Sequence, residues 1–296
     1  MAAHSGNLQV QKDGFMRQNH VLCAGPHGLH RLAYREWGDI DNPRVLFCLH
    51  GLTRSGLDFQ PLAEALADGW RVVAPDLPGR GDSDWLAVKQ DYAPPLYLAD
   101  CITLIARLNV ESVHWLGTSL GGIVGMMLAA LPQSPISRMI LNDVGPFIPA
   151  ASLQRIAAYV GGTPRFADHA QVAALLKHVA ASFGPLSDTQ WLRMAELATR
   201  PAEDGQGLRL HYDPGIAEAF SVGIEQDVSF WPVWDAISCP TLVVRGGLSD
   251  LLTAETAREM TQRGAKAQLW EIPETGHAPM LWQPDQISRV RQFLEG

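Results

Sequence analysis

Short apolar runs alternate with longer amphipathic stretches along most of the chain. A continuous apolar run such as Val45–Leu49 is typical of a strand buried on both faces of a sheet, and the Phe59–Ala67 stretch that follows has helical spacing. The same pattern predicts strands at His20–Ala24, Leu29–Trp37, Val45–Leu49, Arg71–Ala74, Ser112–Leu116, Met139–Leu141, Thr241–Arg245 and Gln268–Ile272. Helices are expected at Phe59–Ala67, Leu96–Leu108, Ser119–Leu131, Ala254–Gln262 and Asp285–Leu294. This alternation predicts an α/β fold whose mostly parallel sheet is flanked by helices.

The start of the chain departs from this alternation. The strands His20–Ala24 and Leu29–Trp37 follow one another without an intervening helix, which predicts an antiparallel edge of the sheet. Residues 1–18, which precede them, are polar and lack a periodic pattern, so we expect a loose N-terminal segment there.

A second departure lies in the middle of the chain, between about Phe147 and Trp234. This stretch carries helical patterns but no obvious strand pattern, and its helices are expected at Leu153–Val160, Gln171–Phe183 and Asp188–Thr199. We therefore predict a core formed by residues 19–145 and 233–296, with a helical cap or lid at 146–232 over the carboxyl edge of the sheet. Open α/β sheets bind their ligands at that edge. A decorative or dimerisation subdomain remains the alternative.

Composition narrows the class of partner. The 296 residues are 47% hydrophobic and 18% charged, which is an ordinary globular balance, and 23 Lys and Arg against 31 Asp and Glu give a net charge of −8. A surface of that sign repels nucleic acid and anionic lipid, so we expect neither as a partner. No apolar stretch approaches the roughly 20 residues that a membrane span needs.

The cysteines and the N-terminus indicate a compartment. The four cysteines, at positions 23, 48, 101 and 239, are far apart and form no C-x-x-C pair, so no metal or redox site is expected. Scattered, core-like thiols suit a reducing environment. Residues 1–11 lack the pattern of a signal peptide, so we expect a cytoplasmic protein. We expect it to be a monomer or a homodimer.

The most informative segment is the strand–turn–helix around Gly117-Thr-Ser-Leu-Gly121. This is the G-x-S-x-G pattern of a nucleophile elbow in the context that the pattern requires. Only small residues fit two positions before and two after Ser119 in so tight a turn, and the turn aims the Ser119 hydroxyl outward. Ser119 is therefore the candidate nucleophile.

The loop after Val45–Leu49 supplies the candidate oxyanion site. His50-Gly51 would let the backbone pass close to a reacting carbonyl, so that the N–H groups of Leu52 and Leu120 would form the two oxyanion donors. We interpret His50 as a structural residue that holds this loop through side-chain hydrogen bonds.

A serine nucleophile needs a base, and the base needs an orienting carboxylate. His277 follows the strand Gln268–Ile272, and Asp250 follows Thr241–Arg245, so both are expected at the same sheet edge as Ser119. The order Ser, acid, His along the chain is the one that accompanies a G-x-S-x-G elbow. Asp143, which closes an earlier strand, is the alternative acid; our first choice is Asp250.

At this point the sequence resembles the α/β-hydrolase superfamily, and specifically its capped esterase-like members. The resemblance runs from about Gly28 to the end and rests on His50-Gly51, Asp76-Leu-Pro-Gly-Arg-Gly-Asp-Ser83, Gly117–Gly122, Gly247-Leu-Ser-Asp250 and Gly276-His277. It implies an eight-stranded sheet with an antiparallel second strand, and a helical cap after the sixth strand, at about Pro146–Pro232.

Differences between this sequence and individual families narrow the range of possible reactions. Haloalkane dehalogenases and epoxide hydrolases use a carboxylate nucleophile and dienelactone hydrolases use cysteine, whereas position 119 is serine. Carbon–carbon bond hydrolases usually carry Asn before that serine and Trp after the histidine, where this chain has Thr118 and Ala278. The resemblance therefore favours an esterase.

The predicted reaction is the cleavage of a small-molecule carboxylic ester, with a small to medium apolar acyl group, through an acyl-enzyme on Ser119 and without metal or cofactor. The residues that flank the motifs predict a pocket formed by Gly51, Leu57, Asp143, Phe147, Ile148 and Met280. Lactone opening, perhydrolysis, acyl transfer, cyanohydrin cleavage or carbon–carbon hydrolysis on the same triad remain alternatives. The alternative that is not an enzyme is a small-molecule receptor with slow or no turnover.

Overall fold

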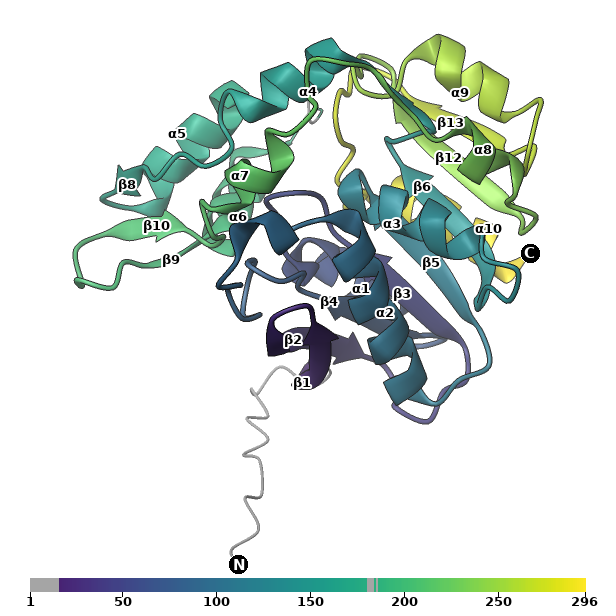
Figure 1. The fold of residues 1–296 in the computed structure, drawn as a ribbon, viewed down its shortest axis with the longest axis horizontal. Helices are drawn as coiled ribbons and strands as arrows, with labels where there is room; N and C mark the ends of the chain where they lie inside the picture. The colour runs from purple at the N-terminus through teal and green to yellow at the C-terminus, as the bar shows by residue number, and fades with distance from the viewer. Residues whose placement is uncertain (1–15, 180–183, 185) are drawn as a thin grey trace, which may run out of the picture.

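A central sheet organises the chain, whose computed structural model describes residues 16–179, 184 and 186–296 (Figure 1). Eight strands lie in the order β1-β2-β4-β3-β5-β6-β12-β13. Their bounds are β1 (Met16–Gly25), β2 (Gly28–Trp37), β3 (Val45–Leu49), β4 (Arg71–Pro75), β5 (Val113–Thr118), β6 (Ile136–Asn142), β12 (Thr241–Gly246) and β13 (Gln268–Ile272). β1 pairs antiparallel with β2, and β2 antiparallel with β4, whereas all the other neighbours are parallel. The predicted fold class and the antiparallel second strand are confirmed.

Helices cover both faces of this sheet because its central strands are apolar on both sides. In β3, the side chains of Leu46 and Cys48 pack into one core cluster, and those of Phe47 and Leu49 into the other. The first cluster includes α1 (Gln60–Leu66) and α10 (Pro284–Glu295), and the second includes α2 (Pro94–Leu108), α3 (Leu120–Ala129), α8 (Trp231–Asp235) and α9 (Ala254–Met260). Two short 3₁₀ turns, η1 (Gly56–Phe59) and η2 (Lys89–Asp91), precede α1 and α2.

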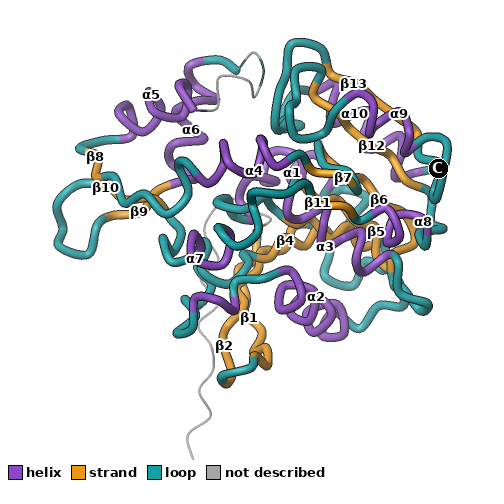
Figure 2. The backbone as a smooth tube through the Cα atoms, turned by 45° about the horizontal axis from the view of Figure 1, so that its top comes forward, coloured by secondary structure: helices purple, strands orange, loops and turns teal. Residues whose placement is uncertain are grey.

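The chain between β6 and α8 forms a distinct group of elements at residues 146–230, which we call the insertion. Its helices are α4 (Ala150–Ala157), α5 (His169–Val179), α6 (Asp188–Ala198) and α7 (Ile216–Phe220). Figures 1 and 2 show α5 and α6 beside β8, β9 and β10 (Arg165–Phe166, Thr199–Pro201 and Leu208–Leu210), away from β12 and β13. Among the described helices, none is both long and apolar enough to cross a bilayer.

Two expectations about local structure are wrong. The insertion is not purely helical, because β8, β10 and β9 form a three-stranded sheet and β7 (Phe147–Ile148) pairs with β11 (Val228–Ser229). Strands of two or three residues are too short to show alternation in a sequence. The predicted loose segment 1–18 also ends too late, because Met16–Gln18 belong to β1 and pair with Arg35–Trp37; residues 1–15 lie outside the described chain. The tail of the predicted helix Gln171–Phe183 also lies outside it, at residues 180–183.

Candidate active site

Ser119 is the single residue between the end of β5 and the start of α3. Its backbone has φ 52° and ψ −117°, a conformation that side-chain-bearing residues seldom adopt and that stores strain at functional sites. A Cβ atom on Gly117 would lie 2.3 Å from the carbonyl oxygen of Gly121, and one on Gly121 would lie 2.0 Å from that of Leu49. The turn can therefore form only with glycine at both positions, as the sequence pattern predicts.

The loop after β13 brings His277 to this serine. The Nε2 atom of His277 lies 2.9 Å from the Ser119 hydroxyl oxygen. On the other side of the ring, Nδ1 lies 2.8 Å from an oxygen of the Asp143 carboxylate. The three side chains form a continuous hydrogen-bonded relay, Ser119–His277–Asp143, although they are far apart in the sequence.

The prediction that Asp250 is the carboxylate partner of His277 is wrong in this structure. The Asp250 side chain is half exposed and pairs with Arg155 of α4, at 2.6 Å from Nε and 2.8 Å from Nη2. The position beside His277 is filled by Asp143, which directly follows β6. The signal for it was present, since Asn142-Asp143 closes a strand at the same sheet edge.

The loop that contains Asp250 supports the acid instead of supplying it. The fully buried Asp143 carboxylate accepts hydrogen bonds from the Gly246 N–H at 2.8 Å and from the Ser249 hydroxyl at 2.6 Å. Sequence reasoning missed both donors, which give no chemical signature of their own. With these bonds the carboxylate stays hydrogen-bonded although no water reaches it, and its orientation toward His277 is fixed.

The loop after β3 is held from two sides. The Nδ1 atom of His50 donates to the Gly51 carbonyl at 2.7 Å, and its Nε2 accepts the Leu77 N–H at 2.9 Å. Burial lowers the pKa of His50 to about 4, so the ring is neutral near pH 7 and can accept that N–H. The buried Arg80 donates from Nε to the Leu52 carbonyl at 2.7 Å. These contacts agree with a structural role for His50.

The two predicted oxyanion donors are both available. Within the described residues, no protein acceptor bonds the N–H of Leu52 or that of Leu120, the first residue of α3. A Cβ atom on Gly51 would lie 3.6 Å from that of Ser119, which is ordinary contact. No described protein atom therefore excludes a side chain at position 51.

Comparisons with known proteins agree with the fold described above. The profile of the alpha/beta hydrolase fold family matches residues 44–284. The chain belongs to the α/β-hydrolase fold family. A 3-hydroxybutyrate-oligomer hydrolase of Cupriavidus necator is 46% identical in an alignment of 287 positions that covers 95% of this chain and 98% of that protein.

Two further relatives of this α/β hydrolase cover most of its length. An alpha/beta hydrolase of known structure from Novosphingobium aromaticivorans is 40% identical, with a TM-score of 0.84 over 94% of this chain and 98% of that one. An esterase from Mycobacterium tuberculosis is 28% identical over 86% of this chain and 83% of its own length.

A cavity of about 400 Å³ opens onto the relay of this hydrolase. Ser119, His277 and Leu52 form part of its wall, so the core supplies the side of the cavity that carries the relay. The insertion supplies much of the remaining wall, which includes Ile156, Tyr159, Leu175, Leu176 and Leu210. Most of these side chains are apolar, and the fixed charges on the lining belong to Arg54, Asp58 and Arg155.

Only part of the predicted pocket lies on this wall. Gly51 and Met280 line the cavity. The predictions for Leu57, Asp143, Phe147 and Ile148 are wrong, because none of the four lies on the lining. Leu57 packs against the apolar cluster around Phe166 and Trp191, Asp143 lies behind His277, and Phe147 and Ile148 form the strand β7. Proximity to a motif in sequence did not reveal which way these side chains point.

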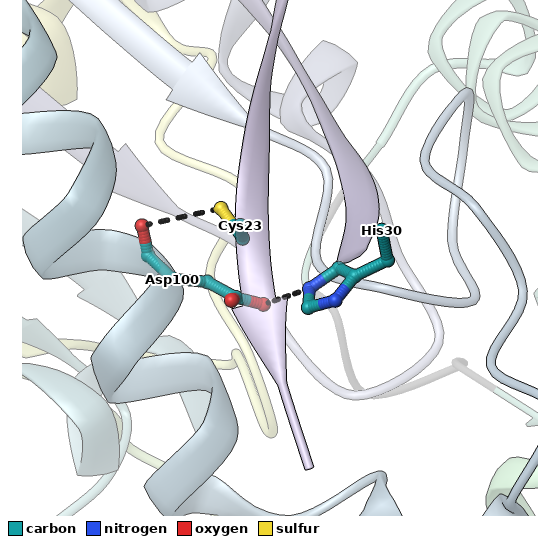
Figure 3. A group of neighbouring side chains, drawn as sticks. All are labelled: Cys23, His30 and Asp100. Atoms are coloured by element: carbon teal, nitrogen blue, oxygen red, sulfur yellow. Dashed lines mark hydrogen bonds and ion pairs between the residues drawn. The ribbon is translucent and has the colours of Figure 1, made fainter. Parts of the chain in front are cut away.

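A second group of reactive side chains lies between β1, β2 and α2 (Figure 3). His30 Nε2 lies 2.9 Å from Asp100 Oδ2, and the Cys23 thiol contacts the Asp100 backbone carbonyl at 4.0 Å. Burial raises the pKa of Cys23 to about 12 and also raises the pKa of Asp100. Metal ligands must be deprotonated, which this environment opposes. We interpret the group as part of the core.

Proposed function

We propose that this α/β hydrolase cleaves carboxylic esters through a covalent acyl-enzyme on Ser119. The observation that carries the proposal is the relay Ser119–His277–Asp143, with bonds of 2.9 and 2.8 Å, at the wall of an apolar cavity. A serine, a histidine and a carboxylate so arranged activate a hydroxyl for attack on a carbonyl carbon. The hydrolase and esterase relatives support the same class of reaction.

Acylation begins when the ester carbonyl lies against the Ser119 hydroxyl. The Ser119 oxygen attacks the carbonyl carbon while its proton passes to Nε2 of His277. The carbonyl oxygen becomes an oxyanion, which the N–H groups of Leu52 and Leu120 stabilise. The C–O bond then breaks, and the leaving alkoxide takes the proton from His277 to depart as the alcohol.

Deacylation repeats these steps with water. His277 removes a proton from water, whose oxygen attacks the acyl carbon, and the Ser119 oxygen leaves and recovers that proton. Asp143 keeps Nδ1–H of His277 oriented throughout, so that Nε2 faces Ser119, and it stabilises the imidazolium while His277 holds the proton. The products are the acid and the free enzyme.

The substrate that we propose is a short linear oligomer of 3-hydroxybutyrate. The relative from Cupriavidus necator with this activity in its name covers nearly the whole chain at 46% identity. A cavity of about 400 Å³ that is lined mostly by aliphatic and aromatic side chains suits a methyl-substituted oligoester. The insertion acts as a cap in this account, because it forms the wall opposite the core.

The direct experiment offers the enzyme a 3-hydroxybutyrate dimer and trimer, together with p-nitrophenyl acetate and butyrate. We expect release of free 3-hydroxybutyrate with a turnover above about 1 s⁻¹, the usual lower range for enzymes. Ser119→Ala should abolish hydrolysis of every ester. Hydrolysis of the p-nitrophenyl esters alone would reject the oligomer as substrate, and full activity of Ser119→Ala would reject the mechanism.

A further inference from the structure

The two arginines on the cavity wall are both paired with an aspartate, but they differ in where that counter-ion lies. Arg54 and Asp58 both line the cavity and form a bidentate ion pair, so that this pair presents little net charge to a ligand. Arg155 also lines the cavity, but its partner Asp250 does not. A ligand inside the cavity therefore faces one guanidinium whose counter-ion lies outside the lining.

Arg155 is held in place by the loop that follows β12. Its Nε and Nη2 atoms bond the Asp250 carboxylate at 2.6 and 2.8 Å, and the Ser152 hydroxyl, one helical turn earlier, donates to the Asp250 carbonyl at 2.7 Å. A bidentate contact uses only part of the five N–H donors of a guanidinium. Part of the remaining donors faces the Tyr159 hydroxyl, which interacts with Arg155 and also lines the cavity. The N–H groups beyond these two contacts can bond a ligand, and their direction is fixed because Asp250 anchors the group.

The exposure of Arg155 places it at the solvent side of the cavity. Its side chain is 44% exposed, whereas that of Arg54 is 15% exposed. A carboxylate gains most from a guanidinium that it can reach without being fully stripped of water, because burial of a charge is costly. The end of a substrate that carries a negative charge is therefore expected near Arg155, while an apolar remainder fills the interior.

We propose that Arg155 binds the terminal carboxylate of an oligoester acid whose ester bond lies at Ser119, and that Asp250 is the residue that positions this arginine. The inference rests on the proposed function, since it assigns the end of the same substrate. In a linear hydroxy-acid oligomer the carboxylate belongs to the alcohol side of the terminal ester. The enzyme therefore releases the carboxylate-bearing hydroxy acid as its first product and leaves the shortened acyl chain on Ser119.

The test compares the 3-hydroxybutyrate trimer with its methyl ester, which has the same chain but no terminal charge. Arg155→Gln should lower kcat/KM for the trimer acid by about 10- to 100-fold, mainly through KM, because a charge-assisted hydrogen bond is lost. The methyl ester should change by less than about threefold, since its neutral end makes no such bond. Arg155→Lys should retain part of the preference for the acid.

Arg165→Gln is the matched control. Arg165 is an exposed arginine of the insertion that pairs with an aspartate, Asp204, but it does not line the cavity. Its replacement should leave the ratio of acid to methyl ester unchanged. An equal loss on both substrates in Arg155→Gln would show that the arginine only supports the fold, and no loss on either substrate would show that it does not bind the carboxylate. Either result overturns the proposal.

A second measurement separates this proposal from the proposed substrate. The trimer acid and its methyl ester are tested as inhibitors of p-nitrophenyl butyrate hydrolysis. If the wild-type enzyme cleaves neither oligomer, stronger inhibition by the acid that disappears in Arg155→Gln still supports the carboxylate site. Equal inhibition by acid and methyl ester, or none by either, rejects the site.

Discussion

The Asp143 carboxylate accepts hydrogen bonds from His277, Gly246 and Ser249, and each of these bonds fixes it further toward the imidazole. Its amide analogue would present an N–H group to Nδ1 and favour the wrong tautomer of His277. Asp143→Asn should therefore lower kcat for p-nitrophenyl butyrate by about 10³- to 10⁴-fold. Steady-state kinetics of purified, folded protein measures this loss.

Asp250→Asn is the matched control for that substitution. It makes the same chemical change at the other strand-end aspartate, whose carboxylate bonds Arg155 rather than His277. Activity on the neutral p-nitrophenyl butyrate should stay within about threefold of the wild type, since no bond to the relay is lost. If Asp250→Asn lost activity and Asp143→Asn kept it, the relay described here would not be the one used.

His50 makes a pH-dependent contribution to stability. Burial lowers its pKa from 6.5 to about 4 in the folded protein, so the unfolded chain binds this proton more readily. The stability that the neutral ring provides is present above about pH 6.5 and is lost as the pH falls toward 4. Between pH 7 and pH 5 this amounts to about 2 kcal/mol of unfolding free energy.

The substitution His50→Gln tests that contribution. The variant should be less stable than the wild type at pH 7, but its unfolding free energy should fall less on acidification to pH 5, by about 2 kcal/mol. Urea denaturation of both proteins at the two pH values measures the difference. Parallel losses of stability in both would mean that another group carries the acid sensitivity.

At the scale of elements, the packing of α3 on β5 leaves no room for a methyl group. A Cβ atom on Gly125 would lie 2.3 Å from Nε1 of Trp115, which donates to the Gly121 carbonyl. The indole cannot move away, because its other side stacks on Phe47 at 4.9 Å between ring centroids. Gly125→Ala should therefore cost about 1–3 kcal/mol of stability through overpacking.

Gly69→Ala is the control for that change, because its Cβ atom would meet nothing within 4 Å. It should leave the urea midpoint nearly unchanged or raise it slightly. An unchanged midpoint in Gly125→Ala would show that α3 can shift away from β5 to make room for the methyl group.

Whether an element can be predicted from the sequence depends on whether local contacts or contacts with distant segments form it. The core strands could be predicted because an apolar run such as Val45–Leu49 is buried on both faces whatever its neighbours are. The serine turn could be predicted because steric limits at Gly117 and Gly121 are local. Strands of two or three residues in the insertion could not, since their pairing depends on segments far away in the sequence.

The choice between the two candidate acids depended on such distant contacts. Asp143 and Asp250 both follow strands that end at the same edge of the sheet, Asp143 directly and Asp250 four residues later, so the sequence offers either as the partner of His277. Asp143 turns toward His277 from a backbone with φ 55°, whereas Asp250 is held by Arg155, 95 positions earlier in the chain. Neither the turn nor the ion pair has a signature that a single sequence reveals.

At the scale of the whole molecule, the cavity is shared by the core and the insertion, so its size should limit the length of the substrate. Ala158, at the C-terminal end of α4, is exposed and lines the cavity. Ala158→Trp should lower kcat/KM for a 3-hydroxybutyrate trimer at least about tenfold more than for p-nitrophenyl acetate, because a large ring obstructs the longer chain. Kinetics on both substrates measures this ratio.

Ala151→Trp provides the comparison on the same helix. Ala151 is also exposed but does not line the cavity, so its replacement should leave the ratio of the two substrates unchanged. Equal effects of the two tryptophans would mean that the cavity wall does not determine chain length.

The account depends most on Ser119 as the residue that is acylated. Its most direct measurement is mass spectrometry of the intact protein and of its peptides after reaction with a fluorophosphonate, which traps an activated serine. The wild-type protein should gain a single adduct, located on Ser119, and lose its esterase activity in step with labelling. Ser119→Ala should gain none and be inactive. An adduct on another residue, or an active Ser119→Ala variant, would contradict the account.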